Sequence, residues 1–263
     1  MLIKLLKYDF KRNYRAFLIF YSLAVVFAAL TRIFLNLEGS TIMYIIGQIC
    51  TGTTIAIICN ILINNLMRLW VGFKNNLYGD ESYLTHTLPV KKSSIYLSKI
   101  ISSLLIMATS FAVIVLTLFI AYYSKENMEM LKALLTPLAQ SFDCDILVVV
   151  FTLILIFFVE FANGLQAGYT GIILGHKMNN SKTGFSVLFG FAIYGATQIV
   201  VVAITFVTAL FNSGLMDLFT SSTPPAFETL KLMAVVSIIS YTAVIIVTGF
   251  INSALLKKGV NVD

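Results

Sequence analysis

Six long apolar runs decide what this chain can fold into. They cover residues 16–35, 42–66, 95–123, 146–174, 184–211 and 232–256. Each run reaches the ~20 residues that a helix needs to cross a bilayer core about 30 Å thick. The runs are continuous rather than alternating, and all four prolines fall between them, which predicts helices rather than barrel strands. We therefore expect an all-α integral membrane protein with six transmembrane helices in a single domain over residues 1–263.

The composition and the distribution of charge support a membrane protein. The chain is 59% hydrophobic and 11% charged, whereas a soluble domain is about 45–50% apolar and about 25% charged. The net charge of +6 is spread over the connecting segments, which argues against a nucleic-acid partner. Fourteen of the 18 Lys and Arg residues fall on the side that holds both termini and residues 67–94 and 175–183. The positive-inside rule therefore predicts cytoplasmic termini.

The first 15 residues have the pattern of a basic amphipathic helix. On a helical wheel the basic side chains form one stripe, which consists of Lys4, Lys7, Lys11 and Arg15. The apolar side chains gather opposite, and they are Leu2, Ile3, Leu6 and Phe10. Such a helix lies in the headgroup plane, with its basic face toward anionic lipid. We expect an interfacial helix over residues 1–15 that precedes the first span.

The longest polar interruption is Gly79–Lys99, which begins in the loop expected over residues 67–94 and ends just inside the third run. Its sequence, GDESYLTHTLPVKKSSIYLSK, mixes acids, aromatics, one histidine, one proline and a basic cluster of Lys91, Lys92 and Lys99. A plain connector needs none of this variety, so the stretch is interpreted as a protein-docking surface, with aromatics and leucines as anchors and charges at the rim. The connections on the other side of the membrane are short, and a short helix is expected around Met128–Leu135.

Glu160 is the only acid in the interior of a span. An intramembrane carboxylate is costly unless it faces protein or water. Asn163 lies on the same face at i+3, and Gln198 is a similar but weaker candidate. These residues either line a substrate path, form a helix or dimer seam, or make an ordinary hydrogen bond between helices. The small-residue pairs Gly164/Gly168 and Gly171/Gly175 predict close packing of this helix against a neighbour.

Several kinds of chemistry have no motif in this chain. There is no GxxxxGK[ST] loop for ATP, no HExxH and no GxSxG. His86 and His176 are far apart in sequence and fall in predicted loops, so a metal site is unsupported and His86 is expected to be a solvated loop residue. We expect a protein that has no catalytic site, metal or cofactor of its own.

The chain resembles the membrane permease subunit of an ABC-2-type transporter, of the small six-span kind found in Gram-positive bacteria. The resemblance is carried by the start MLIKLLKYDFKRNYRAF, by the segment ESYLTHTLPVKKSSIYLSKIISSL and by the order of the spans. It implies a location in the cell membrane, a second permease copy or paralogue, and separate ATP-binding subunits that carry ATP and Mg. It also implies that the loop after the second span is a coupling helix. The residues in or beside that contact would be Glu81, Tyr83, Leu84, Leu88 and Pro89, and Lys91, Lys92 and Lys99 would mark the return to the membrane.

The resulting functional hypothesis is an exporter permease, homodimeric or heterodimeric. It would move a peptide, an antimicrobial, a drug or a lipid-like substrate, with energy from the separate ATPase subunits. Two other classes stay open. One is an ion-coupled secondary transporter that uses Glu160, although no inverted repeat or broken pair of spans is evident. The other is a membrane immunity or scaffold protein that binds a ligand without moving it.

Overall fold

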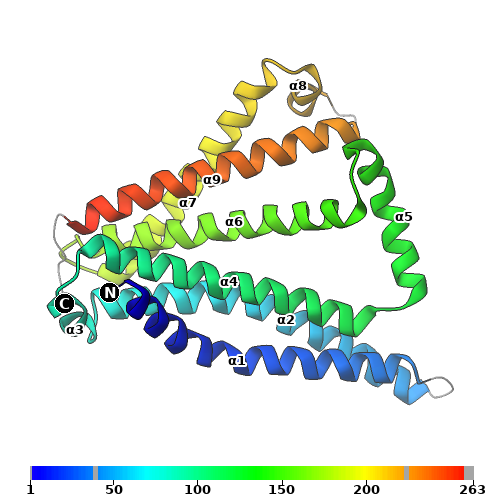
Figure 1. Ribbon diagram of the computed structural model, residues 1–263, viewed down its shortest axis with the longest axis horizontal. Helices are drawn as coiled ribbons and strands as arrows, with labels where there is room; N and C mark the ends of the chain where they lie inside the picture. Colours follow the sequence, from blue (N-terminus) through cyan, green and yellow to red (C-terminus); the bar gives the residue numbers. More distant parts are fainter. Residues whose placement is uncertain (1, 38–40, 222–224, 258–263) are drawn as a thin grey trace. The chain divides into compact units, whose positions relative to one another are not determined.

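The described part of the chain is built from helices. The computed structural model describes residues 2–37, 41–221 and 225–257, which form nine helices and no strand. In chain order (Figure 1) these are α1 (Leu2–Leu35), α2 (Thr41–Leu77), α3 (Ser82–Thr87), α4 (Lys92–Tyr122), α5 (Lys125–Phe142), α6 (Ile146–Gly175), α7 (Lys182–Ala209), α8 (Ser213–Thr220) and α9 (Phe227–Lys257).

Six of these helices are long and apolar enough to cross a membrane. They are α1, in which the span is Phe17–Leu35, and the whole of α2, α4, α6, α7 and α9. Helices satisfy all their backbone hydrogen bonds internally, which is the requirement for crossing hydrocarbon. The expected all-α fold with six candidate spans is therefore confirmed for the described residues, and it is the fold of a multi-pass membrane protein.

Two helix boundaries differ from the sequence-based expectation. α1 runs unbroken through residues 11–20, where the end of an interfacial helix was expected; that stretch contains neither proline nor glycine to end a helix. α2 continues to Leu77, although a loop was expected from residue 67. Leu69, Phe73 and Leu77 are all buried and follow each other at helical spacing, so burial of one face sustains the helix past the apolar run.

The chain divides into two compact units, which we describe separately. The first contains the residues up to Phe73 and Pro89–Glu129; the second contains Lys74–Leu88 and the residues from Met130 onward. The first unit therefore holds α1, most of α2 and α4. The second holds the last residues of α2, α3, most of α5 and the helices from α6 to α9.

In the first unit α1 packs along α4 (Figure 1), and polar side chains hold the helices together. The Tyr21 hydroxyl shares a hydrogen bond of 2.5 Å with Ser110 of α4, and Asn65 of α2 donates to the same Ser110 hydroxyl. Thr31 of α1 and Thr54 of α2 are 3.0 Å apart. All of these side chains are buried, so each bond satisfies groups that hydrocarbon cannot solvate.

In the second unit α6 packs along both α7 and α9 (Figure 1). The α6–α7 contact depends on small residues, as the glycine spacing predicted. The Cα atom of Gly168 lies 3.8 Å from where a Cβ atom at Gly190 would stand. A Cβ atom at Gly171 would lie 2.6 Å from the Gly190 Cα atom, and one at Gly175 would lie 2.5 Å from the Ser186 Cα atom. The predicted close packing of this helix is confirmed, and its partner is α7.

The segment between the third and fourth spans is more ordered than expected. A short helix around Met128–Leu135 was expected, but α5 extends to Phe142 and contains Pro137. Leu135 and Ala139 are buried against Val149 of α6, and these contacts sustain the turns that local sequence alone would not predict. α8 is a further short helix before α9, and its first turn is capped by the Asn212 side chain, which accepts from the Leu215 backbone N–H at 3.1 Å.

The glycine seam gives a direct test of the α6–α7 packing. We expect Gly171→Ala to lower the free energy of unfolding by about 1–3 kcal/mol, because the added methyl group meets the α7 backbone. Gly195→Ala on α7 is the matched control, since a Cβ atom there has no atom within 4 Å. Thermal unfolding in detergent measures both, and equal melting temperatures for the two variants would contradict the seam.

Candidate functional site

Polar side chains of α6, α7 and α9 meet in the second unit, in what we call the Glu160 cluster (Glu160, Tyr194, Gln198 and Tyr241). The Tyr194 hydroxyl donates to Oε1 of Glu160 at 2.7 Å. The Gln198 amide donates to the same oxygen at 2.9 Å. The Tyr241 hydroxyl donates to Oε1 of Gln198 at 2.7 Å. Tyr241 of α9 also interacts directly with the Glu160 side chain, so donors from both α7 and α9 are aimed at this carboxylate.

Further polar bonds follow along α6 toward its C-terminus. Asn163 donates to the Thr197 hydroxyl at 2.9 Å. Asn252 of α9 donates to Oε1 of Gln166 at 3.1 Å. Oδ1 of Asn163 is buried and accepts no hydrogen bond from the described residues. α6 therefore presents a polar strip to α7 and α9, and one acceptor in that strip is left unsatisfied.

The Glu160 cluster lies among apolar side chains. Tyr241 is buried with Val159, Val201 and Val244, and Phe158 packs against this group. Apolar surroundings strengthen hydrogen bonds and charge interactions. The cluster has no serine, cysteine or histidine, so it offers no nucleophile or imidazole base. Among the described residues no group of His, Cys, Asp and Glu is arranged to hold a metal ion. The chemistry available here is binding of a hydrogen-bond donor or a cation.

Sequence reasoning identified part of this cluster. Glu160 and Gln198 were both candidates, and the structure brings them into direct contact. Asn163 was grouped with them but bonds to Thr197 instead. Tyr194 and Tyr241 were missed, because a tyrosine in an apolar run resembles any large apolar residue until its hydroxyl has a partner. The one available signal was the i,i+4 spacing of Tyr194 and Gln198 on one helix face.

The residues expected at the docking surface lie on or beside α3. Glu81, Tyr83 and Leu84 are exposed, the last two at 74% each, and Leu88 is 41% exposed. Pro89 is also exposed, and it is the first residue of the returning segment in the other unit. These side chains are therefore accessible and lie outside the candidate spans, and their role as a docking surface stays a prediction.

α3 is held to the end of α2 by side-chain bonds. Asn76 donates to Oε2 of Glu81 at 2.5 Å, and Thr85 donates to Oδ1 of Asn76 at 3.2 Å. Nε2 of His86 lies 3.0 Å from the Leu77 carbonyl oxygen. His86 was expected to be a solvated loop residue, which is wrong: it is half-buried on a helix, because its ring reaches back to the last turn of α2.

His176 lies in the turn directly after α6, outside the spans as the sequence predicted. It is fully buried at the C-terminal end of α6, with Nδ1 2.8 Å from the Ile172 carbonyl oxygen. Its ring stacks on Tyr78 at 4.2 Å between centroids. Burial raises the pKa of the Tyr78 phenol well above its ordinary value, so the stack stays uncharged on the tyrosine side. Lys74 donates to the Thr183 hydroxyl at 2.9 Å, which also fastens the end of α2 to α7.

The basic stripe of α1 is exposed, but its opposite face contains a residue that sequence reasoning missed. Lys4, Lys7, Lys11 and Arg15 are all exposed. Asp9 is buried and forms an ion pair with Lys99 of α4, and the Ser98 hydroxyl donates to Asp9 at 2.7 Å. The expectation that Lys99 belongs to an exposed basic rim is therefore wrong. Its ammonium is buried because Asp9 supplies a partner.

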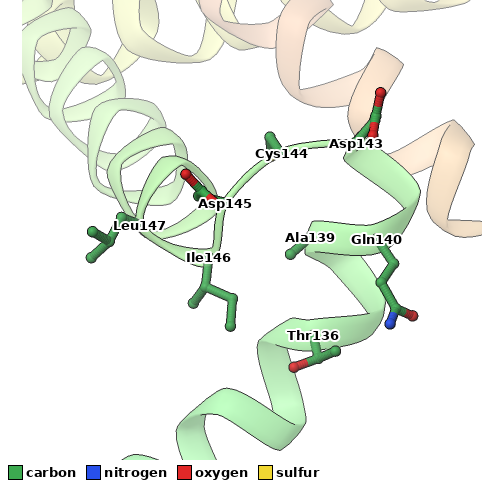
Figure 2. Close-up of a pocket in the computed structure, with 8 residues that line it drawn as sticks. All are labelled: Thr136, Ala139, Gln140, Asp143, Cys144, Asp145, Ile146 and Leu147. Atoms are coloured by element: carbon green, nitrogen blue, oxygen red, sulfur yellow. The ribbon is translucent and has the colours of Figure 1, made fainter.

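A hollow of about 770 Å³ lies at the turn between α5 and α6 (Figure 2). Its polar lining includes Thr136, Gln140, Asp143 and Asp145. In Figure 2 the two aspartates point in different directions and Gln140 points away from Ile146, so the polar groups do not converge on one point. Asp143 has a positive φ of 49°, which fits its place at the end of a helix. The hollow is therefore a weaker candidate than the Glu160 cluster.

Comparison of the chain with models of protein families, with curated proteins and with solved structures finds no match. The functional assignment therefore rests on the residues and contacts of this chain.

The Asp9–Lys99 pair can be tested against an exposed lysine. We expect Lys99→Met to lower the free energy of unfolding by about 3–5 kcal/mol, because it leaves the Asp9 carboxylate buried without its cation. Lys91→Met, at an exposed position in the same segment, is the control and should change it by less than about 0.5 kcal/mol. Chemical denaturation of the purified protein measures the difference, and equal values would mean that the ion pair contributes nothing.

Proposed function

We propose that this chain is the membrane permease subunit of an ABC-type exporter, working with a separate ATP-binding subunit and a second permease copy or paralogue. Two features support the proposal. The described residues provide six helices that can cross a membrane. The sequence contains no phosphate-binding loop, which fits a permease whose ATP is bound by a separate subunit.

The exposed surface of α3 is the observation that carries the proposal. α3 is only six residues long, yet it is fastened by hydrogen bonds on one face and presents Tyr83 and Leu84 on the other. Tyr83 and Leu84 are each 74% exposed, and leaving such apolar side chains uncovered costs free energy. Aromatic and apolar anchors on a rigid support are the residues that dominate binding energy at protein interfaces.

In this proposal α3 is the coupling helix and lies on the cytoplasmic side, where the positive-inside rule puts the connection between the second and third spans. ATP binding draws the two ATPase subunits together, and α3 transmits that movement to the spans as a rigid-body shift. The exposed stripe Lys4, Lys7, Lys11 and Arg15 faces the anionic headgroups of the same leaflet.

Substitution on α3 tests the docking surface. We expect the double variant Tyr83→Asp/Leu84→Asp to recover at least about tenfold less ATP-binding subunit when the tagged chain is purified from its native membrane, because it puts two charges in an apolar contact. Thr87→Asp is the matched control: it adds a charge at an exposed position of the same helix without removing an anchor.

Membrane insertion is to be measured for both variants, since the comparison needs equal amounts of inserted chain. Full association of the double variant would show that α3 is not the contact. If the unaltered chain brings down no ATP-binding subunit at all, the proposed function itself is wrong.

A further inference from the structure

The helix between the third and fourth candidate spans, α5, has two different faces. Its polar stripe consists of side chains that follow each other at helical spacing, which are Lys125, Glu129, Lys132, Thr136 and Gln140. Leu131, Leu134 and Leu138 follow each other at the same spacing on the opposite side, and we call them the leucine arc. A helix whose faces are separated in this way packs its apolar face against an apolar partner.

Protein covers only one edge of this apolar face. Leu135 and Ala139 are buried against Val149 of α6, and Leu138 packs against the same group. Farther round the helix Leu131 is 45% exposed and Leu134 is 67% exposed. An apolar surface that continues outward from a packed contact marks an interaction site. The leucine arc therefore needs a partner other than α6.

The connections of α5 determine where that partner has to be. Two residues separate α4 from α5, and three separate α5 from α6. Both neighbours are candidate spans, and both are apolar up to these ends, over residues 118–121 in α4 and 146–151 in α6. The hydrocarbon of the membrane therefore begins within a few residues of each end of α5.

The length of α5 then leaves it one direction. Its 18 residues make a helix about 27 Å long, whereas a three-residue connection reaches at most about 11 Å. Because both ends are tied close to the membrane, the helix has to lie along the surface and not project from it. Figure 1 shows α5 running across the start of α6 rather than continuing its axis.

The leucine arc is continuous with a surface that meets lipid. At the start of α6, Leu147 is 80% exposed and Phe151 is 64% exposed, and in a membrane span such side chains contact acyl chains. The contact of Leu135 and Ala139 with α6 lies next to the leucine arc on the helix surface, so the arc adjoins the side on which α6 enters the membrane. The polar stripe lies on the other side of α5, toward water.

The charges of α5 indicate which kind of lipid surface fits. Glu126 and Glu129 balance Lys125 and Lys132, so the helix has no excess of basic residues. The basic stripe of α1 differs in this respect. Apolar insertion, and not attraction to anionic headgroups, is then what holds α5 to a membrane.

From these observations we propose that α5 is an interfacial helix, which inserts its leucine arc into the boundary between headgroups and acyl chains and for which a zwitterionic bilayer is a sufficient partner. Since α4 crosses the membrane between α3 and α5, the leaflet concerned is the one opposite α3. The proposal does not depend on the exporter function: α5 binds the bilayer whether or not an ATP-binding subunit docks on α3.

The first test measures fluorescence quenching by brominated lipid. Trp70 is the only tryptophan of the chain, so Trp70→Phe gives a background in which one tryptophan is added at a time. We expect Leu134→Trp, in liposomes of phosphatidylcholine brominated near the headgroup end of its acyl chains, to be quenched at least about twofold more than Lys132→Trp. Lys132→Trp is the matched control, because Lys132 is exposed on the polar stripe of the same helix.

Equal quenching of the two variants would overturn the proposal. Quenching of Leu134→Trp that disappears as the protein-to-lipid ratio is raised would also overturn it, because a second copy of the chain would then cover the leucine arc. Quenching that appears only after anionic lipid is added would show that a zwitterionic bilayer is not sufficient.

A second measurement uses the unaltered chain and so does not depend on how a variant folds. Hydroxyl radicals label leucines that water reaches, and Leu84 of α3 is an internal reference, at 74% exposed against 67% for Leu134. In phosphatidylcholine nanodiscs we expect Leu134 to be labelled at least about fivefold more slowly than Leu84, because lipid covers it. Equal labelling rates would mean that the leucine arc faces water and that the proposal is wrong.

Discussion

Hydrocarbon offers no hydrogen-bond partner, and this constraint governs how polar side chains are used throughout the chain. Many hydroxyls inside the spans return to the carbonyl four residues earlier, as Thr54 does with Cys50 and Thr205 with Val201. Other polar side chains are paired across helices: Tyr21 with Ser110 in one unit, and Asn163 with Thr197 in the other. In both units polar bonds between helices add direction to apolar packing, which by itself has none.

The Glu160 cluster exists because small residues let α6 and α7 approach closely. Gly171 and Gly175 meet Gly190 and Ser186 with no room for a Cβ atom. Toward the other end of the same contact, the helices are near enough for Glu160 to reach both Tyr194 and Gln198. A larger residue in the seam would separate the backbones and stretch these bonds, so the packing and the site are two consequences of one geometry.

The second unit also joins the α3 surface to the helices that bear the cluster. α3 is fastened to the end of α2 through Asn76, and that end is fastened in turn to α6 by the stack of Tyr78 on His176. Under the proposed function, a push on α3 would reach α6 through these contacts. These contacts connect α3 and α6 physically. A measured coupling free energy between the α3 surface and the Glu160 cluster would show that the connection transmits a conformational change.

The sequence by itself determined the class of fold, because an apolar run of about 20 residues can satisfy its backbone in a membrane only as a helix. It also singled out Glu160, Gln198 and the exposed residues of α3, since charge in a span and polarity between spans are visible in one dimension. Only the tertiary structure decided the partners. Whether Lys99 is exposed or buried depends on Asp9, ninety residues earlier. Whether Tyr194 and Tyr241 only pack against apolar neighbours or also donate hydrogen bonds depends on which helices are in contact. The partners of these side chains are set by the distances between helices, and no local sequence pattern predicts them.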